Sequence, residues 1–220
     1  MSASVSIKTI ERLSLYRRLL KNLHKAGRNS VYIYSHELAL FAGITPSQVR
    51  RDLMHMPNLA GNPSKGYRVQ NLLECIERSL GTTELPNIAI CGVGNLGKAL
   101  ISYFRDKKED VSVVAAFDVD KEKINREING TFCWDLAEFK QKQNDLNIEI
   151  VILAVPDDTA QEVAVELVKL GISDFVNCTQ VPLNLPEHVH IENLDIMLCV
   201  EKAAFKAFNR DKIAAHKDKK

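Results

Sequence analysis

Residues 87–97 read NIAICGVGNLG and decide the fold of the larger part of the chain. The apolar run Asn87–Gly92 predicts a buried strand, and it leads into glycines at the spacing G-x-G-x-x-G. Alone this spacing is a weak signal, but between a strand and a helix it is typical of a dinucleotide-binding turn. Gly92 permits the tight turn, Gly94 lets the backbone approach a pyrophosphate, and Gly97 lets the helix pack closely on the strand.

A carboxylate follows the next apolar stretch. Val111–Phe117 predicts a second strand, and Asp118 comes directly after it, 21 residues beyond Gly97. A carboxylate at this spacing accepts hydrogen bonds from ribose hydroxyls and repels a 2′-phosphate, so NAD is favoured over NADP. Two alternatives stay open from these residues: a glycine-rich turn without a ligand, and a related domain that binds CoA or a nucleotide sugar.

The rest of this part alternates strands with helices. The elements expected after Gly92 are a helix over Leu96–Phe104, the strand Val111–Phe117, a short helix, a possible strand near Thr131–Cys133, a helix over Asp135–Gln141, a strand over Glu149–Val155, a helix over Thr159–Leu170 and a strand over Phe175–Cys178. The alternation predicts an α/β fold with a parallel sheet.

In such a sheet the cofactor crosses the carboxyl ends of the strands, so the nicotinamide half is expected near Ala154–Pro156 and Asn177–Thr179. Taken alone, each of these residues is equally well explained as a plain strand terminus. The predicted cofactor-binding residues are Gly92, Val93, Gly94, Asn95, Leu96, Gly97, Asp118, Val119, Val155, Pro156 and Asn177.

The first 80 residues have a different pattern. Apolar spacings of three and four predict a helix over Ile7–Ala26, and Ser35 is a predicted N-cap for a helix over His36–Ala42. Thr45 and Gln48 form a T-x-x-Q capping box for a third helix, which runs to about Met56. A turn-rich stretch, a short strand over Gly66–Val69 and a helix over Asn71–Leu80 follow. Three helices and a β-loop indicate a winged helix that contains a helix-turn-helix.

The charge distribution supports an anionic partner for this first part. Residues 1–80 carry twelve Lys or Arg and five Asp or Glu, a net charge of +7, whereas residues 81–220 sum to −6. Arg and Gln side chains on a recognition helix read base edges, and other basic residues contact phosphates. The predicted DNA-binding residues are Arg12, Thr45, Ser47, Gln48, Arg50, Arg51, Lys65 and Arg68. For each basic residue alone, a solvated surface position is the competing interpretation.

Composition excludes several other classes of protein. The chain has 220 residues, and no apolar run approaches the ~18 residues that a membrane span requires. The charged N-terminus argues against a signal peptide. Five cysteines, none at C-x-x-C spacing, indicate reduced thiols in the cytoplasm rather than a disulfide framework or a metal site.

Taken together, ordered motifs along nearly the whole chain resemble the Rex family of redox-sensing transcriptional repressors. The matching blocks are T-I-x-R-L-x-x-Y-x-R at Thr9–Arg18, V-R-R-D-L at Val49–Leu53, K-G-Y-x-V at Lys65–Val69, G-x-G-N-L-G-x-A-L at Gly92–Leu100, A-A-F-D-V-D at Ala115–Asp120, A-V-P at Ala154–Pro156, G-I-x-x-x-x-N at Gly171–Asn177, V-P-L-x-x-P at Val181–Pro186 and E-N-L-D at Glu192–Asp195.

The resemblance implies a winged-helix DNA-binding domain over residues 1–81 and a Rossmann NAD(H)-binding domain over residues 86–199. It implies a homodimer, with the segment 200–220 as a dimerisation helix swapped between subunits. Oxidised cofactor is compatible with operator binding, and NADH promotes release. The family's switching network matches Arg18, Tyr103 and Asp195, and no catalytic residue is implied.

Two segments depart from the family pattern. Family wings begin with Phe-Gly and are rich in glycine, whereas residues 56–64 read MPNLAGNPS. The family motif N-F-x-P is Asn177-Cys178-Thr179-Gln180 in this chain. The first departure concerns operator binding, and the second concerns packing on the nicotinamide side.

Two other functions compete with a redox-sensing repressor. A winged-helix regulator that senses CoA or ATP would keep the same two domains. A small NAD-dependent dehydrogenase is disfavoured, because the nucleotide-binding region fills the chain after Pro86 and leaves no substrate domain. No histidine of that region follows a predicted strand as a general base would.

Overall fold

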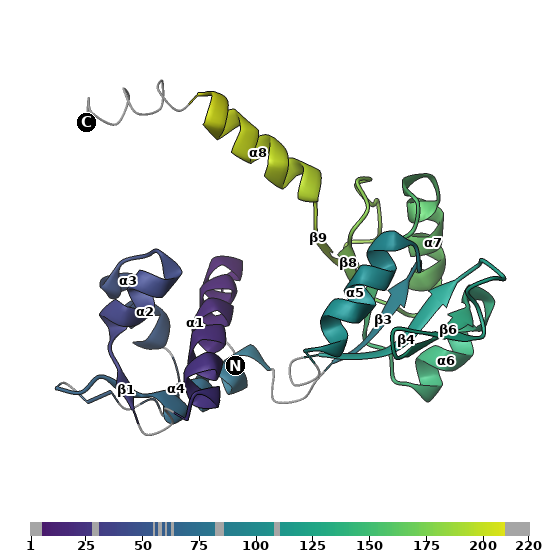
Figure 1. Cartoon of the computed structure of the whole chain (residues 1–220). Coiled ribbons are helices and arrows are strands. Elements are labelled where there is room, and N and C mark those ends of the chain that lie inside the picture. Colours follow the sequence, from purple (N-terminus) through teal and green to yellow (C-terminus); the bar gives the residue numbers. More distant parts are fainter. Residues whose placement is uncertain are drawn as a thin grey trace. The chain divides into compact units, whose positions relative to one another are not determined.

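The computed structural model describes residues 6–27, 31–54, 56, 59, 61–62, 64–81, 86–107 and 111–209. The chain divides into two compact units, Met1–Glu84 and Leu85–Lys220 (Figure 1). Residues 82–85, between the two expected domains, and the part of the expected dimerisation segment beyond Asn209 lie outside the described residues.

The first unit is a winged helix. Its elements are α1 (Ile7–Lys25), β1 (Tyr32–Ile33), α2 (Ser35–Ala42), α3 (Pro46–Met54), β2 (Tyr67–Arg68) and α4 (Val69–Leu80). Apolar residues of the four helices form a single core, in which Tyr16, Leu38, Val49 and Leu72 are fully buried. Gly43 ends α2 in the left-handed region at φ +66°, and α3 begins three residues later. This short connection gives the predicted helix-turn-helix.

The wing is a small antiparallel pair that the sequence predicted only in part. β1 pairs with β2, with Tyr32 opposite Arg68. Gly66 has φ +80°, and a Cβ there would overlap the Ile33 carbonyl, so this position requires glycine. Val69 begins α4 instead of ending the strand, so α4 starts two residues before the predicted Asn71. β1 was not predicted, because two residues are too few to show periodicity.

The second unit is built on one seven-stranded sheet. Its elements are β3 (Asn87–Cys91), α5 (Asn95–Arg105), β4 (Ser112–Asp118), β5 (Arg126–Ile128), β6 (Thr131–Asp135), η1 (Leu136–Glu138), α6 (Phe139–Asp145), β7 (Ile150–Leu153), α7 (Asp157–Lys169), β8 (Asp174–Asn177), β9 (His190–Asn193) and α8 (Ile196–Phe208). The strand order is β5-β6-β4-β3-β7-β8-β9. Every neighbouring pair is parallel except the β5–β6 hairpin.

Without the edge strand β5, this is the strand order of a Rossmann fold, which confirms the predicted class. Alternate residues of the central strands pack on opposite faces of the sheet. Ile88 and Ile90 belong to the cluster that contains Ile101 of α5. Ala89 and Cys91 belong to the cluster that contains residues of α6 and α7. The switch point, where the order reverses, lies between β3 and β7.

Some elements differ from the sequence prediction. The short helix expected after β4 is wrong, because Lys121–Ile124 form turns that lead into β5. The edge strands β5 and β9 were missed, since neither shows an apolar alternation. α8 begins at Ile196 rather than Val200, and none of its residues is buried. Within the described residues no helix is both long and apolar enough to span a membrane.

Candidate nucleotide and nucleic-acid sites

A cavity of about 590 Å³ lies at the carboxyl ends of β3, β4, β7 and β8. This is the crevice at the switch point, where Rossmann folds bind their ligands. One end has a polar lining from the segment after β4, and the opposite end is formed by the segments after β7 and β8. The lining includes Gly92, Gly94, Asn95, Leu96, Asp118, Val119, Asp120, Lys123, Leu136, Val155, Pro156, Asp157, Val163, Cys178, Thr179 and Gln180.

The glycine loop has the geometry that a bound dinucleotide requires. Gly92 has φ +95°, and a Cβ there would overlap the Ala154 carbonyl. A Cβ on Gly97 would overlap the Gly92 carbonyl oxygen, so this glycine allows α5 to approach the loop. Gly94 is different, because a Cβ there would meet no atom within 4 Å. Because Gly94 has no Cβ, the space at the N-terminus of α5 stays free, and a pyrophosphate would bind there to amide N–H groups. The residues therefore fit a dinucleotide.

Asp118 is held by four donors at the polar end of the cavity. Its Oδ2 accepts from Val93 N at 2.7 Å and Lys123 Nζ at 3.2 Å. Its Oδ1 accepts from the backbone N of Val119 at 2.9 Å and of Asp120 at 3.0 Å. Burial alone would raise the pKa of Asp118, but these hydrogen bonds outweigh it and hold that pKa below its usual value. The carboxylate is therefore charged and rigidly placed where an adenosine ribose would lie.

Most of the predicted cofactor residues line this cavity, and three do not. Those that line it are Gly92, Gly94, Asn95, Leu96, Asp118, Val119, Val155 and Pro156. Val93 is buried and reaches the site only through its N–H to Asp118, while Gly97 acts through packing.

Asn177 does not line the cavity, and its side chain fastens the adjoining loop. It is 1% exposed. Its Nδ2 donates to Val181 O and to Asn193 Oδ1, both at 3.0 Å, and its Oδ1 accepts from Thr179 Oγ1 at 2.7 Å. These bonds use the whole side-chain amide, so Asn177 positions the loop rather than offering a polar group to a ligand.

Several lining residues were not predicted as cofactor residues, among them Lys123, Leu136 and Asp157. Lys123 pairs with Asp118 and Asp120, each at 3.2 Å, and Leu136 adds an apolar wall. Asp157 lies at the opposite end and accepts from Gln180 N at 3.0 Å. The signal for Asp157 was its place directly after A-V-P, at the end of a strand already assigned to the site. Lys123 has no comparable signal, since a lysine in a polar loop is ordinary.

In the first unit, the outer face of α3 carries basic and small polar side chains. Thr45, Ser47, Arg50 and Arg51 are exposed. Met54, at the end of the helix, is 74% exposed and was not predicted. The residues of α3 that pack inward are Val49, Asp52 and Leu53. The helix therefore presents one face to the core and leaves the other accessible.

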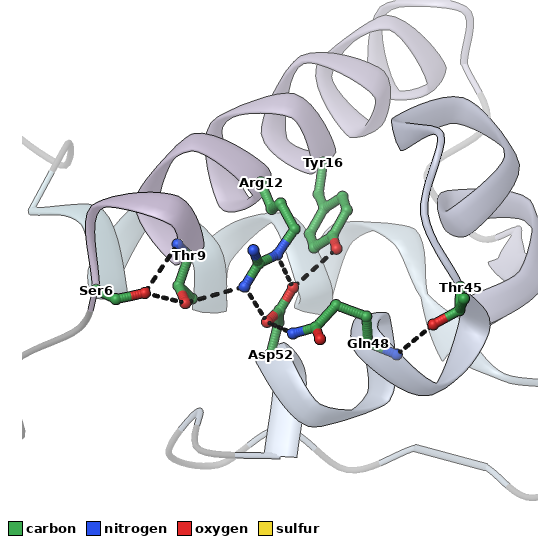
Figure 2. Close-up of polar contacts among 7 residues, drawn as sticks. All are labelled: Ser6, Thr9, Arg12, Tyr16, Thr45, Gln48 and Asp52. Carbon is green, nitrogen blue, oxygen red and sulfur yellow. Dashed lines mark hydrogen bonds and ion pairs between the residues drawn. The ribbon is translucent and has the colours of Figure 1, made fainter. Parts of the chain in front are cut away.

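Arg12 and Gln48, both predicted to contact DNA, are bonded to a buried carboxylate instead (Figure 2). Arg12 Nε and Nη2 donate to Asp52 Oδ2 and Oδ1 at 2.6 and 2.7 Å, a bidentate pair. Gln48 Nε2 donates to the same Oδ1 at 2.8 Å, and Tyr16 OH donates to Oδ2 at 3.0 Å. The Asp52 side chain is 3% exposed. This cluster, called the Asp52 cluster below, joins α1 to α3.

The Asp52 cluster changes the interpretation of the predicted capping box. The predicted capping box is half correct: Thr45 Oγ1 accepts from Gln48 N at 3.2 Å, but the Gln48 amide turns to Asp52 (Figure 2).

Burial alone would raise the pKa of Asp52, but its donors outweigh that effect and lower it. Burial and the bond to Asp52 raise the pKa of Tyr16. Asp52 was missed because its partners in α1 lie 36 and 40 residues away in sequence.

The wing presents two basic residues, Lys65 in its turn and Arg68 in β2. Asn62 Oδ1 accepts from the backbone N of Ser64 and of Lys65, at 2.9 and 3.0 Å, and Tyr34 OH donates to Ser64 O at 2.9 Å. Lys65 and Arg68 are exposed, and the Lys65 ammonium lies 5.8 Å from the centre of the Tyr32 ring. Part of the altered wing segment, at residues 57, 58, 60 and 63, lies outside the described residues.

The three predicted switch residues occupy accessible positions. Arg18 is exposed on α1, and Tyr103 is 59% exposed on α5. Asp195 is the N-cap of α8, and its Oδ1 accepts from Leu198 N at 2.8 Å. The hydroxyl of Tyr103 and the carboxylate of Asp195 therefore belong to the same unit, whereas Arg18 belongs to the other.

Burial makes the thiols of three cysteines less acidic. Burial raises the pKa of Cys91 and of Cys178, and it raises the pKa of Cys133 to about 11, so these thiols stay protonated at neutral pH. Within the described ranges no three His, Cys, Asp or Glu side chains are placed to hold a metal ion.

Comparisons with known proteins agree with both sites. A family described as a CoA binding domain matches residues 83–181, and one described as a putative DNA-binding protein N-terminus matches residues 4–53. The redox-sensing transcriptional repressor Rex of Bacillus licheniformis is 36% identical over 90% of each chain. Rex of Desulforamulus reducens is 35% identical over 93% of this chain and 96% of its own.

Solved structures give the same result. The Rex-family repressor RSP is 28% identical, with a TM-score of 0.82 over 99% of this chain and all of its own. RSP in complex with NAD⁺ and operator DNA has a TM-score of 0.84 at the same identity, over 100% of this chain and 99% of its own. RSP in complex with NADH has a TM-score of 0.81, over 98% of this chain and 99% of its own.

Proposed function

Since this chain belongs to the Rex family of redox-sensing transcriptional repressors, we propose that it binds operator DNA when NADH is scarce and leaves it when NADH binds. The observation that carries this proposal is the pairing, in one chain, of a winged helix with a cavity built around a G-x-G-x-x-G loop and Asp118. We place this activity in the cytoplasm, where operator DNA and NAD(H) meet.

For DNA recognition, the accessible face of α3 supplies the base contacts. Ser47, Arg50 and Arg51 lie on this face, and an arginine can pair bidentately with guanine. Met54 adds an apolar group suited to a thymine methyl. Lys65 and Arg68 of the wing contact phosphates. Arg12 and Gln48 act indirectly, because the Asp52 cluster fixes the orientation of α3 relative to α1.

For nucleotide recognition, the cavity divides its tasks between its two ends. Asp118 and Lys123 define the end that accepts the adenosine ribose, and the negative charge of Asp118 disfavours a 2′-phosphate. The amide groups near Gly94 hold the pyrophosphate. The nicotinamide then lies between the segments after β7 and β8, and the nucleotide supplies the redox state that is sensed.

The C-terminal helix supports a homodimer. α8 has no buried residue, and it exposes large apolar side chains at Ile196, Met197, Leu198, Val200, Phe205 and Phe208. An apolar helix of this kind requires a covering surface. We assign that surface to a second copy of the chain, with α8 exchanged between subunits as expected for the family.

A switch between two states follows from the three residues carried over from the family. In one state the hydroxyl of Tyr103 bonds to Asp195, and in the other Asp195 pairs with Arg18. NADH shifts this equilibrium only by its difference in affinity for the two states, typically about 1–3 kcal/mol of coupling. Movement of the paired recognition helices off successive major grooves then releases the DNA.

The test is fluorescence anisotropy of the full chain on a palindromic operator recovered by selection. We expect micromolar NADH to release the DNA and NAD⁺ to have little effect. Because one matching family is described as a CoA binding domain, CoA and ATP are titrated in parallel. Release by CoA or ATP but not by NADH would contradict redox sensing and establish the other nucleotide as the effector.

The dehydrogenase alternative is not supported. The relatives that match nine-tenths of this chain are transcriptional repressors, and the described strands of the second unit form one nucleotide-binding sheet.

A further inference from the structure

The nicotinamide end of the cavity contains one charged side chain. Four lining residues are charged: Asp118, Asp120, Lys123 and Asp157. The first three lie together after β4, where Lys123 balances the two carboxylates. Asp157 lies at the opposite end, on the first turn of α7, and no ion pair to it is found among the described residues.

The position of Asp157 is fixed by the loop on the other side of this end. Its Oδ1 accepts from Gln180 N at 3.0 Å, which bridges the segments after β7 and β8. Gln180 stands where the family motif N-F-x-P has proline, and a proline could not donate this bond. The loop itself is braced by Asn177, whose amide bonds to Thr179, Val181 and Asn193. The carboxylate is therefore held at the cavity by this chain's own departure from the family motif.

The neighbouring residues do not neutralise this charge. Val155, Pro156 and Val163 are apolar, and Thr179 and Gln180 are polar but uncharged. Cys178 is also neutral at physiological pH, because burial raises the pKa of its thiol. Among the side chains that line this end of the cavity, Asp157 is the one with a charge that a bound ring would meet.

The two forms of the cofactor differ in charge at this point. The nicotinamide ring of NAD⁺ carries a positive charge, and the ring of NADH does not. A carboxylate within several ångströms stabilises a cation, by an amount that grows as the effective dielectric constant falls. Resting on the redox-sensing function proposed above, we propose that Asp157 sets the redox threshold by selectively strengthening NAD⁺ binding. More NADH is then needed to displace NAD⁺ and release the operator.

The variant Asp157→Asn separates charge from position. An asparagine keeps an oxygen that accepts from Gln180 N and has nearly the same volume, so the loop stays in place. Asp158→Asn is the matched control, because Asp158 is the next residue on the same helical turn, is exposed, and does not line the cavity. Both variants change the net charge equally.

The experiment measures the dissociation constants of NADH and NAD⁺ for the full chain, directly by NADH fluorescence and by displacement for NAD⁺. We expect Asp157→Asn to weaken NAD⁺ binding by about three- to tenfold while NADH changes by less than about twofold. Asp158→Asn is expected to leave the ratio of the two constants unchanged. The effect of Asp157→Asn should shrink at high ionic strength, because salt screens an accessible charge.

An equal change for both cofactor forms would overturn the proposal and leave Asp157 as a loop fastener. An unchanged NAD⁺ affinity, or an equal effect from Asp158→Asn, would overturn it as well. Failure of the unmodified chain to bind either nucleotide is a separate result, since it would overturn the redox-sensing function together with this inference.

Discussion

Two carboxylates, buried Asp52 in the first unit and half-buried Asp118 in the second, are held by different kinds of donor. Among the described residues, Asp52 accepts hydrogen bonds from side chains of α1 and α3, whereas Asp118 accepts from three backbone amides and Lys123. In both, burial opposes the charge and the donors outweigh it. The backbone cradle follows from the fold and leaves the site open to a ligand. The side-chain cluster around Asp52 depends on the identity of each partner residue. It fixes the position of α3, whose proposed DNA contacts lie on the opposite face of that helix.

Removal of the Asp52 carboxylate is expected to have the largest effect. In Asp52→Ala the Arg12 guanidinium and the Tyr16 hydroxyl lose their partner inside the unit, which should cost about 3–5 kcal/mol of unfolding free energy. Chemical unfolding is followed by far-UV circular dichroism for the helices and by fluorescence of Trp134. Trp134 is the one tryptophan of the chain and lies in the second unit, so it reports that unit alone.

We expect the helix signal of the first unit to move to lower denaturant. Glu11→Ala, at an exposed position of α1, is the control and should change stability little. If Asp52→Ala were no less stable than this control, the Asp52 cluster would not be what holds α1 to α3.

Removal of the Asp118 carboxylate should act on binding. Asp118→Ala deletes a charged acceptor at the adenosine end of the cavity, and the loss of such a hydrogen bond costs about 1.5–3 kcal/mol, or about 10- to 100-fold in affinity. NADH titration by fluorescence measures it, with Glu122→Ala, an exposed neighbour outside the cavity lining, as the control. Unchanged NADH affinity in Asp118→Ala would show that this carboxylate serves only the protein loop.

A smaller difference should separate two residues of the recognition helix. Arg51→Ala removes an exposed side chain, and we expect about a tenfold loss of operator affinity at unchanged stability. Gln48→Ala removes a side chain already bonded to Asp52, so the loss should stay below about threefold. Anisotropy at fixed salt compares the two variants. A larger effect from Gln48→Ala than from Arg51→Ala would mean that the glutamine leaves Asp52 to read a base.

The smallest effect concerns pH. The pKa of Asp52 is lowered in the folded state, so its contribution to stability is fully present above the unfolded carboxyl pKa of about 3.9 and is lost as pH falls through the lowered folded value. Acid unfolding of the unmodified chain and of Asp52→Asn, which cannot titrate there, measures this contribution. The stability gap between them should narrow below about pH 4, and a gap constant down to pH 2 would contradict the assignment.

The parts of the fold that were predictable share a long or well-spaced signal. The glycines of the G-x-G-x-x-G loop and the acid after the second strand stand at fixed spacings, and helix α1 repeats its apolar spacing over many residues. The structure has all three at the predicted positions. β1, β5 and β9 have two to four residues each and pair through the backbone, so their side chains show no pattern that would predict a strand.

The candidate sites were predictable where backbone geometry decides the outcome, and less so where one side chain selects another. Gly94 and Asp118 line the cavity as expected, because strand and turn place them there. Arg12 and Gln48 were assigned to DNA by residue type, since nothing in their spacing reveals a buried acid in α3. Asn177 ends a strand as predicted, but the loop that follows takes all of its hydrogen-bonding groups.

The most direct test of the account is NADH-driven release of operator DNA from Gly94→Ala, beside the unmodified chain. A Cβ at Gly94 meets no protein atom within 4 Å, so the fold and DNA binding should persist while the nucleotide is blocked from the glycine loop. We predict that micromolar NADH releases the unmodified chain and leaves Gly94→Ala bound to the operator. Equal release of both proteins, or of neither, would contradict the claim that NADH acts through this cavity to control DNA binding.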